Sequence, residues 1–141
     1  MLLTVEKSHC EERQKIIVSR DNGTSREHRA KNLEQKYCVR HYKLDGEVVV
    51  QQKCCDFLLV NDTRRQAYFI ELKGRNIDEA VPQLENAVKI CSQELKGYEI
   101  YYRIVSSKAR THEIKKLSFR KFQDKCGSKL RYQTGCMEEE L

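Results

Sequence analysis

The 141-residue sequence lacks any apolar run near the roughly 20 residues that a membrane-spanning helix needs. Its start, MLLTVEKSHCEER, is apolar over too short a stretch for a secretory signal. Internal repeats, low-complexity segments and linkers are also missing. These absences predict a soluble, cytoplasmic protein with no membrane partner, folded as a single domain over residues 1–141.

The seven cysteines lack the features of a disulfide framework and of a zinc site. Their number is odd, no secretory signal precedes them, and Cys54 and Cys55 are adjacent, a pair that rarely forms a bridge. Neither a CxxC spacing nor a His/Cys cluster is present. We therefore expect reduced thiols that are buried or incidental.

Positive charge is concentrated in two segments, although the formal net charge is only +6. The cations of the first segment are Arg20, Arg26, Arg29, Lys31, Lys36, Arg40 and Lys43. Those of the second are Lys108, Arg110, Lys115, Lys116, Arg120, Lys121, Lys125, Lys129 and Arg131. Such segments suit a phosphate backbone, because each neutralised phosphate releases counterions. Taken alone, they are weak evidence for nucleic-acid binding, since most charged segments are solvated surfaces.

The first half of the chain predicts one helix and two hairpins. Thr24 or Ser25 can cap a helix running to about Tyr37. Asp45-Gly46 lies between two strand-like runs and predicts a hairpin turn. The strands CDFLLV and AYFIELK follow, separated by the polar stretch NDTRRQ.

The second half predicts two helices and two strands. A helix from about Ile77 to Lys96 has an apolar stripe, holds Pro82 in or near its first turn and ends at Gly97. YEIYYRIVSS and KLRYQT are rich in strand formers, and a basic helix over about 111–125 lies between them. The order predicts an α/β fold with a mixed central sheet of four or more strands flanked by helices.

Three ionisable residues are predicted to share one face of the CDFLLV and AYFIELK hairpin. Antiparallel pairing centred between residues 63 and 64 places Asp56 opposite Glu71, and strand alternation puts Lys73 on the same face. The rest of both strands is apolar, so unpaired charges there are costly. Two carboxylates supply the oxygen ligands that Mg²⁺ or Mn²⁺ prefers.

Asp56, fourteen intervening residues and then Glu71-Leu72-Lys73 resemble the signature of the PD-(D/E)XK nuclease superfamily, which includes restriction endonucleases and Holliday-junction resolvases. The resemblance covers about residues 23–105, with Cys55 where the signature has proline. It implies a restriction endonuclease-like core and a metal-dependent nuclease that hydrolyses phosphodiester bonds in DNA. It also implies a nucleic acid as partner, leaving RNA open, and permits a homodimer.

The resemblance also implies roles for single residues. Asp56 and Glu71, with the Leu72 carbonyl, would hold Mg²⁺ or Mn²⁺, and Lys73 would orient water and offset developing charge. Glu27 corresponds to the acidic residue that the family carries on a preceding helix, with Glu34 as the alternative. Gln83 resembles a glutamine that some members carry beside the site, although Ala87 replaces the tyrosine that often follows it.

Two further interpretations remain open on the sequence alone. Asp56 and Lys73 can form an ordinary cross-strand ion pair, with Glu71 exposed at a strand end and Glu27 and Gln83 on helix surfaces. The chain can also be a catalytically inactive domain of the same fold that binds nucleic acid or another protein, since a fold does not determine a function.

Overall fold

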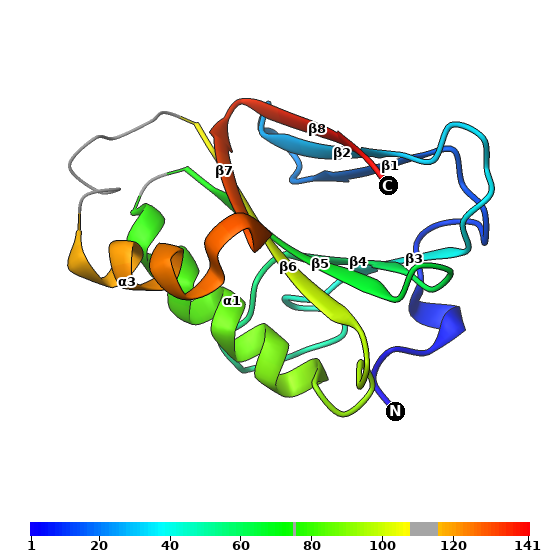
Figure 1. The fold of residues 1–141 in the computed structure, drawn as a ribbon, viewed down its shortest axis with the longest axis horizontal. Coiled ribbons are helices and arrows are strands. Elements are labelled where there is room, and N and C mark those ends of the chain that lie inside the picture. The colour runs from blue at the N-terminus through cyan, green and yellow to red at the C-terminus, as the bar shows by residue number, and fades with distance from the viewer. Residues whose placement is uncertain (75, 108–115) are drawn as a thin grey trace.

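A computed structural model describes residues 1–74, 76–107 and 116–141. These residues form an α/β fold with two mixed sheets (Figure 1). The described helices are α1 (Ile77–Cys91) and α3 (Leu117–Cys126), with 3-10 turns at Val5–Lys7 and Gly127–Lys129. The strands are β1 (Ile16–Arg20), β2 (Glu27–Lys31), β3 (Val39–Lys43), β4 (Phe57–Asn61), β5 (Gln66–Lys73), β6 (Glu99–Ser106), β7 (Leu130–Thr134) and β8 (Cys136–Glu140).

The larger sheet has five strands in the order β3-β4-β5-β6-β7. Strands β3, β4 and β5 are antiparallel neighbours, whereas β5, β6 and β7 are parallel. Every residue of β4 is buried, as are the first seven residues of β5, which agrees with their apolar sequences. The predicted mixed central sheet is confirmed.

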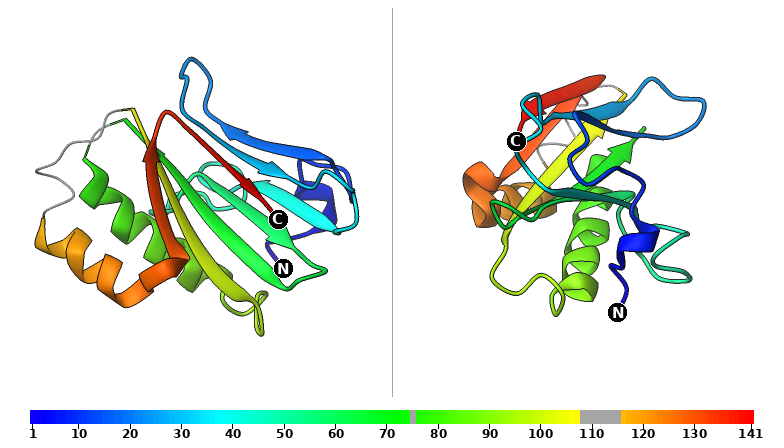
Figure 2. Two further views of the ribbon diagram at one scale, coloured as in Figure 1. Left: turned by 45° about the horizontal axis from the view of Figure 1, so that its top comes forward. Right: turned by 90° about the vertical axis from the view of Figure 1, so that its right-hand side faces the viewer.

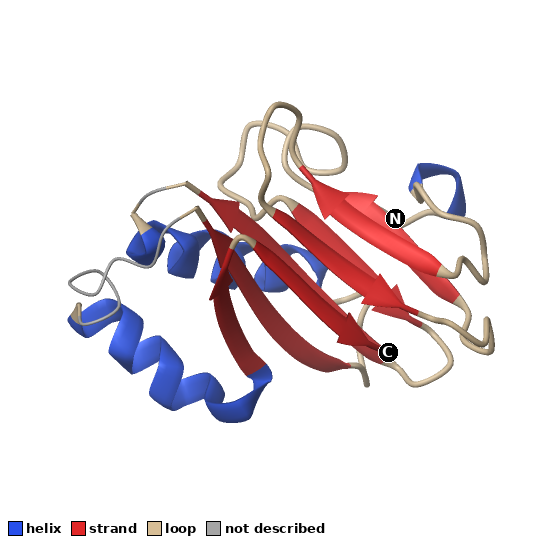
Figure 3. Cartoon of the chain, turned by 90° about the horizontal axis from the view of Figure 1, so that it is seen from above, coloured by secondary structure: helices blue, strands red, loops and turns tan. Residues whose placement is uncertain are grey.

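Helices α1 and α3 cover one face of this central sheet (Figure 3). The buried side of α1 carries the expected stripe at helical spacing, and Phe119 and Phe122 anchor α3. Leu58, Val60 and Phe69 supply the sheet side of this first core. No helix in the described part of the chain is long and apolar enough to cross a membrane. All seven cysteines are free thiols, as expected.

A three-stranded sheet, ordered β1-β2-β8, lies over the opposite face of the central sheet (Figures 1 and 2). Strand β2 pairs antiparallel with β1 and parallel with β8. Ile17, Ala30 and Met137 point into a second core, where they meet Leu59 and Ile70 of the central sheet. The fold therefore has three layers, with the central sheet in the middle.

The predicted helix from residue 24 to 37 is wrong, because residues Glu27–Lys31 form strand β2. In this strand His28 and Ala30 are buried, while Glu27, Arg29 and Lys31 are partly exposed. This alternation has the period of a strand. Leu33, which the helical spacing would bury, is 48% exposed. Pairing with β1 and β8 overrides the weak strand propensity of EHRAK.

Smaller corrections concern the turns and helix ends. Gly46 has a φ of +87° and does form a turn, but residues 47–50 form no second strand, and β3 pairs with β4 instead. Helix α1 ends at Cys91 rather than Lys96, and Pro82 lies inside it, beyond the first turn. The predicted basic helix appears as α3, while residues 111–115 of that prediction lie outside the described residues. Strands β6 and β7 are confirmed.

A buried ionic cluster ties the small sheet to the central sheet. Glu139 of β8 accepts two hydrogen bonds from Arg103 of β6, at 2.8 and 3.0 Å, and its Oε2 lies 2.6 Å from Nε2 of His28 in β2. Although burial opposes it, these hydrogen bonds lower the pKa of Glu139 to about 2. The cluster fixes the small sheet, and with it the loop between β1 and β2.

We expect Glu139→Gln to destabilise the protein by about 3–5 kcal/mol near neutral pH, because it leaves the Arg103 guanidinium buried without its carboxylate. A depressed pKa stabilises the folded state above the unfolded value, and this stabilisation is lost as the pH falls toward 2. The difference in the free energy of unfolding between variant and wild type should therefore shrink at low pH. Urea unfolding across pH measures it, and Glu138→Gln, at a 52% exposed side chain, is the control. An effect independent of pH would contradict the prediction.

Candidate functional site

The register of the β4–β5 hairpin brings the two predicted carboxylates together. Phe57 pairs with Ile70, so Asp56 and Glu71 are the next two residues across the ladder. Their side chains are close enough to share a hydrogen bond. They lie at the end of strands that are otherwise buried and apolar. The predicted placement of both carboxylates on one face agrees with this geometry.

Each carboxylate is oriented by a backbone N–H of the opposite strand. The Asp56 N–H donates to Glu71 Oε1 at 3.1 Å, and the Leu72 N–H donates to Asp56 Oδ2 at 2.9 Å. These reciprocal bonds continue the β4–β5 ladder through side-chain oxygens where β4 has ended. One oxygen of each carboxylate thus accepts a hydrogen bond from the backbone, and the second oxygen of Glu71, Oε2, lies 3.6 Å from Lys73 Nζ.

Lys73 connects the carboxylate pair to helix α1. Its Nζ lies 3.6 Å from Glu71 Oε2 and donates to Gln83 Oε1 at 2.8 Å. Glu79, one helical turn before Gln83, lies 3.6 Å from the same ammonium group. The structure therefore brings Gln83 to the predicted site. The simple Asp56–Lys73 ion pair does not describe the geometry, because the lysine pairs with Glu71 and Glu79.

Burial and mutual repulsion make ionisation of both carboxylates costly. The Glu71 side chain is only 2% exposed. Burial and the nearby charge of Asp56 raise the pKa of Glu71 to about 9, against a smaller opposing effect of Lys73. Burial also raises the pKa of Asp56, although the hydrogen bond from Leu72 lowers it. Near neutral pH the Glu71 carboxyl group therefore keeps its proton unless a further positive charge is brought to the pair.

The donor set at this position fits a hard divalent cation. Two closely spaced carboxylates offer oxygen ligands, and Mg²⁺ usually binds through one or two carboxylates and keeps several waters. Across residues 1–74, 76–107 and 116–141, no three or more His, Cys, Asp or Glu side chains form a cluster that could hold a metal ion. Asp56 and Glu71 are therefore the side-chain ligands to test, beside the Leu72 carbonyl.

The structure does not bring Glu27 or Glu34 to this site as helical residues. Glu27 lies in β2, where its Oε2 accepts hydrogen bonds from Arg29 at 2.8 and 3.1 Å. Glu34 follows β2 and lies 3.5 Å from Lys36 Nζ, with its side chain 78% exposed. The expected acidic helix before the hairpin is absent from this described segment, and strand β2 takes its place.

Three residues near the site were not singled out from the sequence. Asp21 and Lys43 are close enough to Asp56 for their charges to act on its carboxyl group. Arg26 donates to the Ser107 hydroxyl at 2.6 Å and packs its guanidinium against Gly74, the residue after Lys73. Asp21 and Arg26 belong to the β1–β2 loop, whose position depends on the small sheet and leaves no local signal in the sequence.

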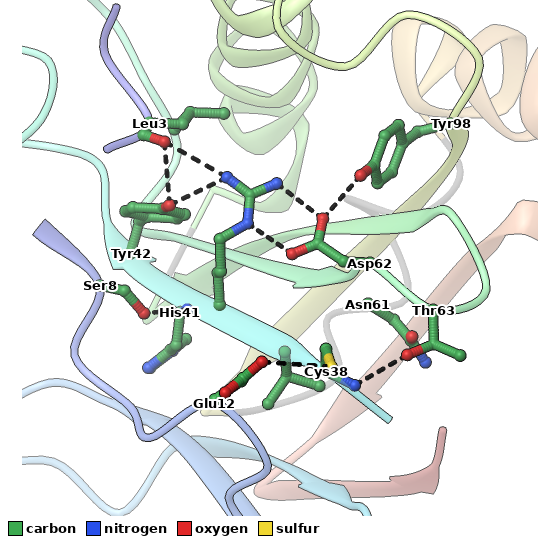
Figure 4. A network of polar contacts seen from close by, with 12 residues as sticks. Leu3, Ser8, Glu12, Cys38, His41, Tyr42, Asn61, Asp62, Thr63 and Tyr98 are labelled. Carbon is green, nitrogen blue, oxygen red and sulfur yellow. Dashed lines mark hydrogen bonds and ion pairs between the residues drawn. The ribbon is translucent and has the colours of Figure 1, made fainter. Parts of the chain in front are cut away.

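A second polar network, at the other end of the hairpin, is structural (Figure 4). Arg40 donates twice to Asp62, at 2.7 and 2.8 Å, and also to Tyr42 and the Leu3 carbonyl. Tyr98 donates to Asp62 at 2.6 Å. The charges of Arg40 and Asp62 are thus paired within the network, whereas Asp56 and Glu71 place two carboxyl groups beside each other.

Comparison with known proteins adds no assignment. No protein-family model matches the chain, and neither a curated protein nor a solved structure gives a significant match.

We expect Glu71→Gln to be more stable than the wild type near pH 7.5, by about 2–4 kcal/mol. A carboxyl group whose folded pKa is about 9 rather than 4.5 loses stability as the pH rises between these values, and glutamine has no such loss. The gain should vanish near pH 4. Thermal or urea unfolding at both pH values measures it, with Glu79→Gln, at a 61% exposed side chain, as the control. A gain of equal size at both pH values would argue against the assigned cause.

Proposed function

We propose that the chain is a metal-dependent nuclease of the PD-(D/E)XK type, which hydrolyses phosphodiester bonds in DNA with Mg²⁺ or Mn²⁺. One observation carries the proposal: the Asp56 and Glu71 carboxylates meet at the end of two buried strands, with the Lys73 ammonium 3.6 Å from Glu71. Three ionisable groups in such an apolar setting are costly unless they are paired, hydrogen-bonded or bound to a metal, and such groups cluster at functional sites.

The arrangement of elements supports a restriction endonuclease-like core. Strands β3, β4 and β5 form an antiparallel series, α1 follows the strand that carries Glu71 and Lys73, and β6 returns parallel to β5. The chain departs from the expected core in the segment before β3. The resemblance implies a helix there, and the chain has strands β1 and β2 instead. The acidic contribution of Glu27 is accordingly left out of the proposed site.

Asp56 and Glu71 would hold the cation, together with the Leu72 carbonyl. Bound there, Mg²⁺ or Mn²⁺ supplies charge neutralisation at the phosphate and lowers the pKa of a bound water. The protein contributes fixed positions, because the N–H groups of Asp56 and Leu72 orient one oxygen of each carboxylate. It also contributes a partly dehydrated setting, in which charge interactions are stronger than in water.

Lys73 would act on the reacting phosphate. Hydrolysis forms a bond between a water oxygen and phosphorus and breaks the bond to the sugar oxygen, while negative charge builds on the phosphate oxygens. The Lys73 side chain is 18% exposed, and its ammonium group would orient the water and offset this charge. Gln83 is a positioning residue, since its Oε1 accepts a hydrogen bond from that ammonium.

The direct test is cleavage of supercoiled, single-stranded and branched DNA in Mg²⁺ or Mn²⁺. We expect the wild type to cut, and Asp56→Ala and Lys73→Ala to lose about 10²- to 10⁴-fold in rate. Glu27→Gln is the matched control, because that carboxylate is held by Arg29 in β2, and it should stay within about twofold of the wild type.

Absence of metal-dependent cleavage by the folded wild type, with DNA binding retained, would replace this proposal by the non-cutting interpretation. Equal loss in Glu27→Gln and Asp56→Ala would also contradict it, because a general loss of folding or binding would then explain both. Circular dichroism of each variant separates loss of activity from loss of structure.

We further expect Gln83→Ala to lower kcat about tenfold with little change in KM. A hydrogen bond to a charged group contributes about 1.5–3 kcal/mol, and without it Lys73 is held less firmly. Gln83→Glu keeps an acceptor oxygen and should recover part of the rate, whereas a purely structural role would make both variants alike. Steady-state kinetics on one DNA substrate distinguishes these outcomes.

A further inference from the structure

An open groove runs between the edges of the two sheets and ends beside the proposed site. Its walls come from β1, the edge strand of the small sheet, and from β3, the edge strand of the central sheet. The groove has a volume of about 470 Å³. Its lining includes Ile16, Val18 and Arg20 on one side and His41, Lys43 and Phe57 on the other.

The groove and the carboxylate pair lie at the same end of the central sheet. Lys43 pairs with Phe57 in the β3–β4 ladder, and Phe57 directly follows Asp56. Asp21 and Lys43, which line the groove, are close enough to Asp56 for their charges to act on its carboxyl group. The groove lies on the side of the small sheet and the pair on the side of α1, so a chain leaving the groove would pass around the end of the sheet to reach the pair.

Cations without a carboxylate partner gather at this end. Among the seven cations between Arg20 and Lys43, four form ion pairs with neighbouring acidic residues of the described chain: Arg29, Lys31, Lys36 and Arg40. Arg20 donates to the Thr24 carbonyl, and Lys43 lies over the Phe57 ring, 5.2 Å from its centroid. Within the described chain neither has a carboxylate within 4.0 Å, so both can bind phosphate.

The remaining cation of the seven without a carboxylate partner lies next to the end of β5. Arg26 contacts Gly74, the residue after Lys73, and Ser107, and its buried Nε has no hydrogen-bond partner among the described residues. Arg20 and Lys43 thus line the groove and Arg26 lies beside the strand that carries Glu71, against one acidic residue in the groove, Asp21. This distribution suits a chain of phosphates at this end of the sheet.

The size of the groove selects the form of the nucleic acid. Its volume of about 470 Å³ lies in the range of pockets that enclose one small ligand. It therefore has room for a short stretch of a single strand and not for a DNA duplex. The apolar side chains of Ile16 and Val18 are half-buried and offer contact to bases, while Arg20 and Lys43 meet the backbone.

We propose that the groove between β1 and β3 binds a single-stranded segment of the polynucleotide and holds it next to the end of the central sheet that carries Asp56 and Glu71. The inference rests on the proposed nuclease function and specifies its substrate: a single strand, or the single-stranded part of a branched molecule.

Binding of labelled single-stranded DNA, measured by fluorescence anisotropy in EDTA so that no cleavage occurs, tests the proposal. We expect the single strand to bind at least tenfold more tightly than a blunt duplex of the same sequence. The double variant Arg20→Ala/Lys43→Ala should weaken single-strand binding on the order of tenfold. It should also reduce the slope of log K against log salt by about 1.4, which is two contacts at about 0.7 each.

Arg64→Ala/Lys89→Ala is the matched control, since it removes one arginine and one lysine that are exposed, in the β4–β5 turn and on α1. This variant should bind within about twofold of the wild type. Equal losses of single-strand affinity in both double variants would overturn the proposed role of the groove. Duplex binding as tight as single-strand binding would overturn it as well.

The outcome for the groove is separable from the outcome for catalysis. Wild-type cleavage in Mg²⁺ together with unchanged binding by the groove variant would overturn this inference and leave the nuclease proposal standing. Groove-dependent binding of a single strand without any cleavage would support the groove and overturn the nuclease.

Discussion

The register of the β4–β5 hairpin is the constraint on which the proposed site depends. Asn61 Oδ1 accepts the Arg64 N–H and Arg65 adopts a positive φ of 56°, so the chain reverses at a fixed point. From that point the ladder runs to Asp56 and Glu71 without a bulge. Because strand side chains alternate between faces, a slip of one residue would move Glu71 to the opposite side of the sheet. The turn thus sets which side chains face each other at the proposed site.

The same strands make ionisation of both carboxylates energetically unfavourable, which is the condition under which the proposed cation would be bound. A fully apolar hairpin would bury these positions at no electrostatic cost, as it does at Leu58 and Phe69. The chain instead supplies two backbone N–H groups and one ammonium, which satisfy part of the negative charge. The unsatisfied part is what a divalent ion and a phosphate can share. Burial of two neighbouring carboxyl groups conflicts with the apolar pattern of the hairpin, and such conflicts are expected at functional sites.

The sequence predicts the central sheet well, because its strands carry their own signals. CDFLLV and AYFIELK are apolar, lie close together in the chain and pair through a short turn, so Asp56, Glu71 and Lys73 could be placed from spacing alone. The small sheet could not be placed, because EHRAK and CMEEE contain few strand formers and pair across more than 100 residues. Its strand character comes from burial of His28, Ala30 and Met137 against the central sheet. Asp21 and Arg26 were missed for the same reason.

The small sheet therefore links the end of the chain to the proposed site. Strand β1, one wall of the groove, contacts no other strand of its sheet than β2, and β2 is held on its other side by β8. Strand β8 is in turn fixed to β6 by the bonds between Glu139 and Arg103. Loosening that contact would move the β1–β2 loop, and with it Asp21 and Arg26, without touching either carboxylate. Substrate binding should thus be more sensitive to β8 than the hairpin geometry is, because Asp56 and Glu71 are positioned within the central sheet alone.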